Sequence, residues 1–287
     1  MRMTRGWVLL WAALAGTGVS GQVTAAMTAP QKPFRIAGDL YYVGSQDLAS
    51  YLVVTPQGDI LVNGNLASSP PQIRASVEAL GFRWRDIKIL LNGQAHYDHS
   101  AGNAQILRET GAQLMVMDGD VSAMESGGRD DFEPIGTFPP AHVSRVLQDR
   151  DTVSLGGVTL TAHKTAGHTR GCTTWTMQVH DKQGRELDVV IVGGYAPLDS
   201  YRLVASAGHA ASYPGIAEDF KRTFATLQSL PCDIFLGSHG GYFNLQGKLA
   251  KMASQGEAVW IDPAGYHRAV QEAQHAFEQQ LQKQTLR

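Results

Sequence analysis

The stretch Gln94-Ala95-His96-Tyr97-Asp98-His99 is the most informative part of this sequence, because it places four possible metal ligands within six residues. It follows Ile87–Leu91, which has the pattern of a short buried strand. A turn at the end of a strand aims several side chains at one point. Imidazole and carboxylate groups together suit zinc or another borderline divalent ion. A lone histidine is more often packed or solvated, but so dense a cluster predicts a metal site.

Two later histidines have the same setting. His168 lies in the glycine-flanked stretch 166–171, where a tight loop follows a strand. His239 comes directly after the apolar strand 234–236 and precedes two glycines. Either residue alone would as readily be a structural histidine. In a chain that already holds the first cluster, both are predicted to be metal ligands.

Strands and helices recur in both halves of the chain. In the first half, strands are predicted within 39–63 and at 87–91, and helices at 69–80 and 101–110. In the second half, the pattern predicts hairpins over 152–164 and 173–192, a strand at 234–236, and helices at 216–227 and from Asp262-Pro263 onward. This pattern predicts two sheets packed between helices. The expected architecture is a four-layer αββα sandwich with the site along one sheet edge.

Composition and charge narrow the class of protein. Hydrophobic residues make up 43% and charged residues 17% of the 287 residues, an ordinary globular balance. The formal net charge of -2 gives no reason to expect nucleic acid or an anionic membrane as a partner. After the first residues, no linker or low-complexity tract divides the chain, so residues 27–287 are predicted to form one domain.

The N-terminal 26 residues are predicted to be a secretory signal peptide. Arg2 and Arg5 precede an apolar run, and small residues around Ala26 form a cleavage site. The apolar run is too short to span a bilayer, so we expect no membrane anchor after cleavage. The mature protein is expected to be a periplasmic monomer. Export permits a disulfide between Cys172 and Cys232 without requiring one, and two free thiols are expected.

The metal motifs carry a family resemblance. The HxHxDH-like cluster, the later Gly-His-Thr-x-Gly loop and the Ser238-His239 pair together resemble the metallo-β-lactamase superfamily. Within it the chain is similar to subclass B3, and especially to its GOB-type branch, in which Gln stands at the first ligand position as Gln94 does here. Four further stretches resemble that subclass: 126–128, 138–140, 230–233 and 262–266. The resemblance covers nearly the whole mature chain.

The resemblance implies a binuclear zinc hydrolase. Gln94, His96 and His168 would hold one zinc ion, and Asp98, His99 and His239 the second. The implied activity is hydrolysis of penicillins, cephalosporins and carbapenems by a metal-bound hydroxide, which confers antibiotic resistance. Asp98 would be the catalytic residue, as a ligand and as the acceptor of the hydroxide's proton. The Ser-x-x-Lys motif of serine β-lactamases does not occur in the sequence.

The end of one strand helps to choose among hydrolases of this fold. Lactonases, glyoxalase-type thioester hydrolases and phosphodiesterases usually carry an aspartate there that bridges both metals. In this chain the strand 189–192 ends in Gly193-Gly194-Tyr195, without a carboxylate. B3 enzymes also lack this aspartate. The absence therefore favours a β-lactam substrate.

Two residues are candidate substrate contacts. Tyr195 would offer a hydroxyl to the substrate carboxylate, or its ring simply packs at a strand end. Arg170, beside His168, would attract the same carboxylate, or it is solvated like most arginines in loops. Two other functions stay open: a hydrolase of this fold that acts on a lactone or other ester, and a non-catalytic zinc-binding protein.

Overall fold

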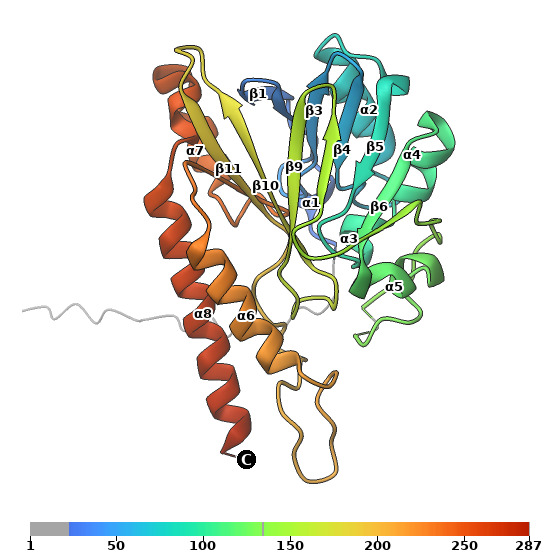
Figure 1. The fold of residues 1–287 in the computed structure, drawn as a ribbon, viewed down its shortest axis with the longest axis vertical. Helices are drawn as coiled ribbons and strands as arrows, with labels where there is room; N and C mark the ends of the chain where they lie inside the picture. Colours follow the sequence, from blue (N-terminus) through green and yellow to red (C-terminus); the bar gives the residue numbers. More distant parts are fainter. Residues whose placement is uncertain (1–22, 134, 287) are drawn as a thin grey trace, which may run out of the picture.

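Two β-sheets pack face to face between helices in this protein (Figure 1). The computed structural model describes residues 23–133 and 135–286. Most of the predicted signal peptide, residues 1–22, lies outside the described residues. The layers are those of the predicted four-layer αββα sandwich.

The first sheet has seven strands in the order β1-β2-β3-β4-β5-β6-β7. Strands β1 to β4 are antiparallel, and strands β4 to β7 are parallel. Their bounds are β1 Phe34–Ala37, β2 Leu40–Tyr42, β3 Tyr51–Thr55, β4 Gly58–Val62, β5 Ile87–Leu91, β6 Gln113–Met117 and β7 Arg145–Leu147.

The second sheet has five strands in the order β12-β11-β10-β9-β8. Its pairs are antiparallel except β11 with β12, which run parallel. Their bounds are β8 Thr152–Leu155, β9 Val158–Lys164, β10 Thr173–His180, β11 Glu186–Val192 and β12 Ile234–Gly237.

Helices cover the outer faces of the two sheets. Helices α2 and α4 lie on the first sheet, whereas α6 and α8 lie on the second (Figure 1). The helices are α1 Ala25–Thr28, α2 Pro70–Ala79, α3 Tyr97–Ser100, α4 Asn103–Thr110, α5 Val121–Ser126, α6 Ile216–Ser229, α7 Leu245–Gln255 and α8 Pro263–Thr285, with short 3-10 turns η1 Trp84–Asp86, η2 Asp118–Asp120 and η3 Gly256–Trp260.

The core consists of two clusters of buried side chains. The larger one fills the space between the sheets and continues under α6 and α8, where Phe220, Phe224 and Phe277 stack on one another. The smaller one lies between the first sheet and helices α2 and α4, around Val77 and Ile106. Burial of these apolar surfaces is the main force that holds the layers together.

Most of the predicted elements are confirmed, with small shifts at their ends. Helix α2 starts at Pro70 as the Ser-Pro signal predicts, and the Asp262 carboxylate accepts a hydrogen bond from the Gly265 N–H at 2.9 Å, which caps α8. The β8–β9 hairpin turns at Gly156 and Gly157, both with positive φ. Strands β1, β6 and β7 and helices α1, α3, α5 and α7 were not predicted.

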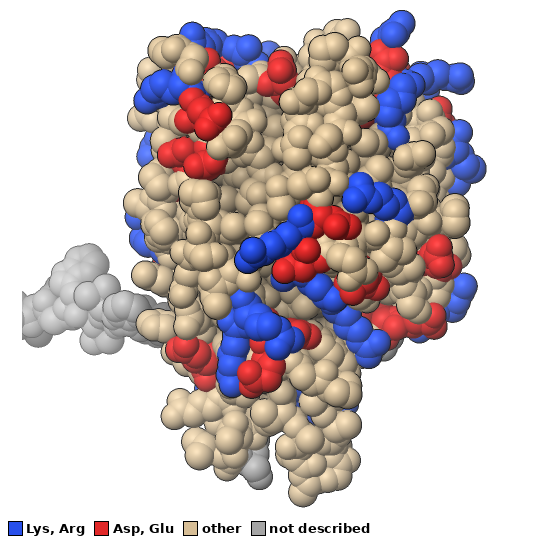
Figure 2. Space-filling model, in the orientation of Figure 1, with Lys and Arg blue, Asp and Glu red and all other residues tan. Residues whose placement is uncertain are grey.

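Among the described residues, Cys172 and Cys232 are both free thiols, as expected. Cys172 is buried and Cys232 is half-buried. None of its helices has the length and apolarity to cross a membrane. On the face shown in Figure 2, basic and acidic side chains are interspersed.

Candidate metal centre and active site

The six predicted ligands come from three loops on the two sheets. Residues 94–99 follow β5 of the first sheet, and Asp98 and His99 lie in the short helix α3. His168 lies in the loop between β9 and β10, and His239 follows β12, both in the second sheet. Because side chains of both sheets take part, the centre exists only when the two sheets are packed together.

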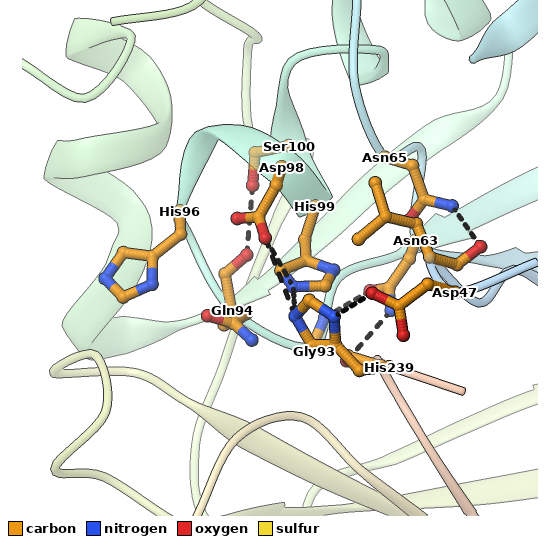
Figure 3. A network of polar contacts seen from close by, with 12 residues as sticks. Asp47, Asn63, Asn65, Gly93, Gln94, His96, Asp98, His99, Ser100 and His239 are labelled. Atoms are coloured by element: carbon orange, nitrogen blue, oxygen red, sulfur yellow. Dashed lines mark hydrogen bonds and ion pairs between the residues drawn. The ribbon is translucent and has the colours of Figure 1, made fainter. Parts of the chain in front are cut away.

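Asp98, His99 and His239 form one compact group of ligand atoms (Figure 3). One ligand atom of each lies within 4.8 Å of the others. The Asp98 Oδ2 atom is 3.4 Å from His99 Nε2 and 3.6 Å from His239 Nε2. A carboxylate and two imidazoles with their ligand atoms turned to one point are a donor set that zinc prefers.

Asp47 orients His239 from behind. Its Oδ2 atom lies 3.0 Å from His239 Nδ1, which leaves Nε2 directed at Asp98 and His99 (Figure 3). Burial alone would lower the pKa of His239, but the hydrogen bond to Asp47 and the charges of Asp98 and Asp47 raise it. A carboxylate on the far nitrogen of a metal-binding histidine fixes the tautomer and the ring orientation.

His96 and His168 form a second group beside Gln94. Their ring centroids are 4.7 Å apart at an interplanar angle of 67°. His168 Nδ1 lies 2.7 Å from the carbonyl oxygen of Ala196. His96 Nε2 lies 3.4 Å from the Tyr201 hydroxyl and 3.7 Å from Asp131 Oδ2. These contacts leave Nδ1 of His96 and Nε2 of His168 as the atoms available to a metal.

Gln94 presents an unpaired oxygen in this group. Its Nε2 atom donates a hydrogen bond to the carbonyl oxygen of Gly193 at 2.9 Å, which fixes the orientation of the amide. The Oε1 atom is buried and has no hydrogen-bond partner among the described residues. A buried acceptor without a partner costs about 1–3 kcal/mol. Such an oxygen fits a cation, and so the residues of this group fit a zinc ion.

Burial favours the neutral form of His96, His99 and His168. It holds the pKa of His96 and of His99 well below the usual range, and the pKa of His168 is also lowered by burial. Neutral imidazole is the form that binds a metal. These three imidazoles are therefore in the form that binds a metal ion.

Asn63 ties two of the ligand loops together. Its Oδ1 atom accepts a hydrogen bond from the Gly93 N–H at 2.8 Å, and its Nδ2 atom donates to Ser238 Oγ at 3.1 Å. Gly93 and Ser238 directly precede Gln94 and His239. The φ of Asn63 is +66°, a left-handed conformation that asparagine tolerates better than most residues. The bond network around Asn63 is drawn in Figure 3.

Asp47, Asn63, Asp131 and Tyr201 were not singled out by the sequence analysis. Each is a lone polar or aromatic residue in a loop, far along the chain from the ligand, or from the residue next to a ligand, that it contacts. No spacing or strand-end position marks them. Only the packing of the two sheets brings them to the site.

Comparison with known proteins agrees with this geometry. The family model described as the metallo-beta-lactamase superfamily matches residues 47–239, from the residue that orients His239 to His239 itself. The chain belongs to the metallo-β-lactamase superfamily.

Solved structures of metallo-β-lactamases are similar over nearly the whole chain. FEZ-1 from Legionella gormanii is 46% identical, with a TM-score of 0.86, over 90% of this chain and 98% of that one. GOB-18 from Elizabethkingia meningoseptica is 33% identical, with a TM-score of 0.86, over 95% and 100%. BJP-1 of Bradyrhizobium japonicum, described as subclass B3, is 34% identical, with a TM-score of 0.83, over 91% and 98%. The predicted relationship to the B3 enzymes is confirmed.

Within this metallo-β-lactamase fold, the end of strand β11 has no room for a side chain. A Cβ atom on Gly193 would lie 2.3 Å from the carbonyl oxygen of Gly93. A Cβ atom on Gly194 would lie 2.6 Å from Cδ2 of His168. Real Cβ atoms essentially never come so close to another heavy atom. A bridging aspartate is thus sterically excluded at both positions.

The two predicted substrate contacts of this metallo-β-lactamase, Tyr195 and Arg170, both lie against aromatic rings. Tyr195 is buried, and its ring packs edge-on against Tyr242 with centroids 4.7 Å apart. The exposed Arg170 guanidinium lies 5.8 Å from the ring centroid of Phe132 and 5.3 Å from that of Tyr213. Their roles toward a substrate stay predictions.

Proposed function

We propose that this protein is a zinc-dependent hydrolase that opens the amide of β-lactam rings in penicillins, cephalosporins and carbapenems, and so confers antibiotic resistance. The proposal is supported by the family, by relatives described as β-lactamases and by the ligand set. The observation that carries it is the pairing of two ligand groups beside a strand end, at Gly193 and Gly194, that admits no bridging carboxylate.

The two groups would hold one zinc ion each. Gln94, His96 and His168 would bind the first, and Asp98, His99 and His239 the second. When bound, zinc lowers the pKa of a water molecule toward neutrality and polarises a carbonyl oxygen. The second group has a carboxylate and two imidazoles, whereas the first has a neutral amide. We therefore expect the second group to bind zinc more tightly and to fill first.

Asp98 is the proposed catalytic carboxylate. Its side chain is partly exposed, and its Oδ2 atom faces the Nε2 atoms of His99 and His239. As water attacks the lactam carbonyl, Asp98 takes one of its protons. The C–N bond of the ring then breaks, the ring nitrogen takes up the proton that Asp98 held and becomes an amine, and the new carboxyl group releases the second proton of the water to solvent. Arg170 and Tyr195 are the proposed contacts of the substrate carboxylate.

We further propose that residues 1–26 are a signal peptide and that the mature monomer works in the periplasm. The order of basic, apolar and small residues supports this proposal. The intact mass of protein recovered from the periplasm tests it. A mass that includes Arg5 would contradict it.

The deciding experiment is carbapenem hydrolysis by the purified protein, with and without a chelator. We expect turnover that a chelator abolishes, that added Zn²⁺ restores and that clavulanate-type inhibitors leave unchanged. An acyl-lactone assayed in parallel separates the two hydrolase classes. Faster turnover of the lactone than of any β-lactam, or β-lactam turnover that clavulanate stops and a chelator does not, would overturn the proposal.

A further inference from the structure

Asp120 is a buried carboxylate outside the predicted ligand set. It ends the short turn η2, directly after strand β6 of the first sheet. Its exposed fraction is 2%. Burying a carboxylate is costly unless hydrogen bonds compensate it, so its place in the fold requires an explanation.

Both oxygens of Asp120 accept hydrogen bonds from the loops that carry the first ligand group. Oδ2 accepts from the Ala95 N–H at 3.0 Å and from the Thr169 hydroxyl at 2.7 Å. Oδ1 accepts from the Gly171 N–H at 2.7 Å. Ala95 stands between Gln94 and His96, and Thr169 follows His168. One carboxylate thus joins the loops of all three ligands of this group.

The backbones around this contact are already as close as they can be. A Cβ atom on Gly119 would lie 2.2 Å from the carbonyl oxygen of Arg170. A Cβ atom on Gly171 would lie 2.4 Å from the backbone nitrogen of Asp120. The loop of His168, in the second sheet, is therefore held directly against the end of β6, in the first. The two loops therefore have no free space in which to adjust when the Asp120 side chain is changed.

We propose that Asp120 is a positioning residue for the Gln94, His96 and His168 group, and that it sets the metal affinity of this group separately from that of the Asp98, His99 and His239 group. The inference rests on the proposed function. Burial raises the pKa of the Asp120 carboxyl to about 6. Because this pKa still lies below neutral pH, the carboxyl group is ionised there and can accept all three hydrogen bonds.

The carboxylate is needed because the donors approach both of its oxygens. An asparagine at position 120 has only one acceptor oxygen, and its NH2 group would face either Gly171 N–H or the pair Ala95 N–H and Thr169 O–H. At least one donor would then be unpaired and face another donor. The loops would move apart, and the distance between His168 and the residues after β5 would grow.

Asp47 provides a matched control, because it supports the other group. It contacts His239 Nδ1 at 3.0 Å and is likewise an aspartate behind the ligands. Removing an outer partner of this kind lowers metal affinity about 10- to 100-fold. If each aspartate serves its own group, the two substitutions affect different zinc ions.

The test is a titration of the metal-free protein with Zn²⁺ against a chelating dye, which gives two stepwise dissociation constants. Native mass spectrometry counts the ions at each step. We expect Asp120→Asn to weaken the second, weaker step about 10- to 100-fold and to leave the first step unchanged. Asp47→Asn is expected to weaken the first step. Val77→Ala, which removes buried side-chain volume in helix α2, controls for a loss of stability alone and should change neither constant.

Thr169→Val is the milder variant, since it removes one donor to Asp120 and no charge. We expect a smaller weakening of the second step only, and this result carries the test if Asp120→Asn is insoluble. Equal weakening of both steps, or an unchanged second step in Thr169→Val and Asp120→Asn, would overturn the proposal and leave Asp120 a structural residue. A wild-type protein that binds no Zn²⁺ would instead contradict the proposed function itself.

Discussion

The Nε2 atoms of His99 and His239 lie 3.1 Å apart, although the two residues are 140 positions apart in the sequence. Their rings are nearly perpendicular, at 88°, and both nitrogens face Asp98 Oδ2. Three atoms that can bind a metal ion therefore converge on one point, from a short helix after β5 and from the residue that follows β12.

Replacing Asp98 with alanine should damage catalysis far more than folding. A carboxylate that takes a proton in the transition state contributes about 10²- to 10⁴-fold to the rate, and we expect kcat/KM to fall by that range. Asp98 belongs to neither of the two core clusters, so the circular dichroism spectrum and the soluble yield should stay near those of the wild type. A loss of soluble protein comparable to the loss of activity would mark Asp98 as structural instead.

Replacing Gln94 with histidine should tighten the weaker zinc site. An imidazole nitrogen is a better zinc donor than an amide oxygen, and the Oε1 atom of Gln94 is the group's unpaired acceptor. We expect the second dissociation constant in a zinc titration to fall while the first stays the same. Two equally tight sites in the wild type, or no change in Gln94→His, would show that Gln94 only hydrogen-bonds Gly193.

The buried carboxyl of Asp59 should make the free energy of unfolding depend on pH, independently of the metal centre. Its carboxyl lies at the start of β4, and burial raises its pKa to about 6 from the ordinary 3.8. The folded state therefore holds this proton more tightly than the unfolded state. The resulting stability is complete below pH 3.8 and is lost as the pH rises through about 6.

Asp59→Asn, which cannot ionise, should therefore be more stable than the wild type above pH 6. The difference in melting temperature should shrink toward pH 4, and each kcal/mol corresponds to about 2–4 °C in a domain of this size. Thermal unfolding of both metal-free proteins at several pH values measures it. A difference that does not change with pH would refute the account.

Arg170→Ala should raise KM for a β-lactam without changing kcat. Arg170 is exposed, and an exposed ion pair contributes up to about 1 kcal/mol, or about a fivefold change in KM. Arg170→Lys keeps the charge and serves as the control, with a smaller rise. An unchanged KM in Arg170→Ala would leave only the stacking on Phe132 and Tyr213 as its role. Tyr195→Phe tests the other predicted contact in the same assay.

Local sequence patterns were sufficient to predict the sandwich and to single out the six candidate ligands, whereas their division into two groups came from the family resemblance. A dense motif after a strand and two glycine-flanked histidines at strand ends are local patterns, and strand ends of neighbouring strands meet at one edge of a sheet. The start of helix α8 could also be predicted from the sequence, since Asp262 and Pro263 both mark it.

The supporting residues could not be predicted in the same way. Asp47 and Asp120 stand in ordinary loop sequences, and their roles depend on contacts with residues 192 and 51 positions away. Helix α7, Leu245–Gln255, was missed because it contains Gly247; its N-cap residue Asn244 has a positive φ, which local sequence pattern does not reveal. These features arise from the packing of the two sheets rather than from local pattern.

Because the predicted ligands come from both sheets, zinc bound as proposed would stabilise the packing of the two sheets against each other. A ligand that binds only the folded state at 100 times its dissociation constant adds about 2.7 kcal/mol to stability. An environment poor in zinc would thus remove activity and at the same time increase the fraction of unfolded chains exposed to proteases. The lifetime of the protein, and not only its turnover, is then set by the free zinc concentration around it.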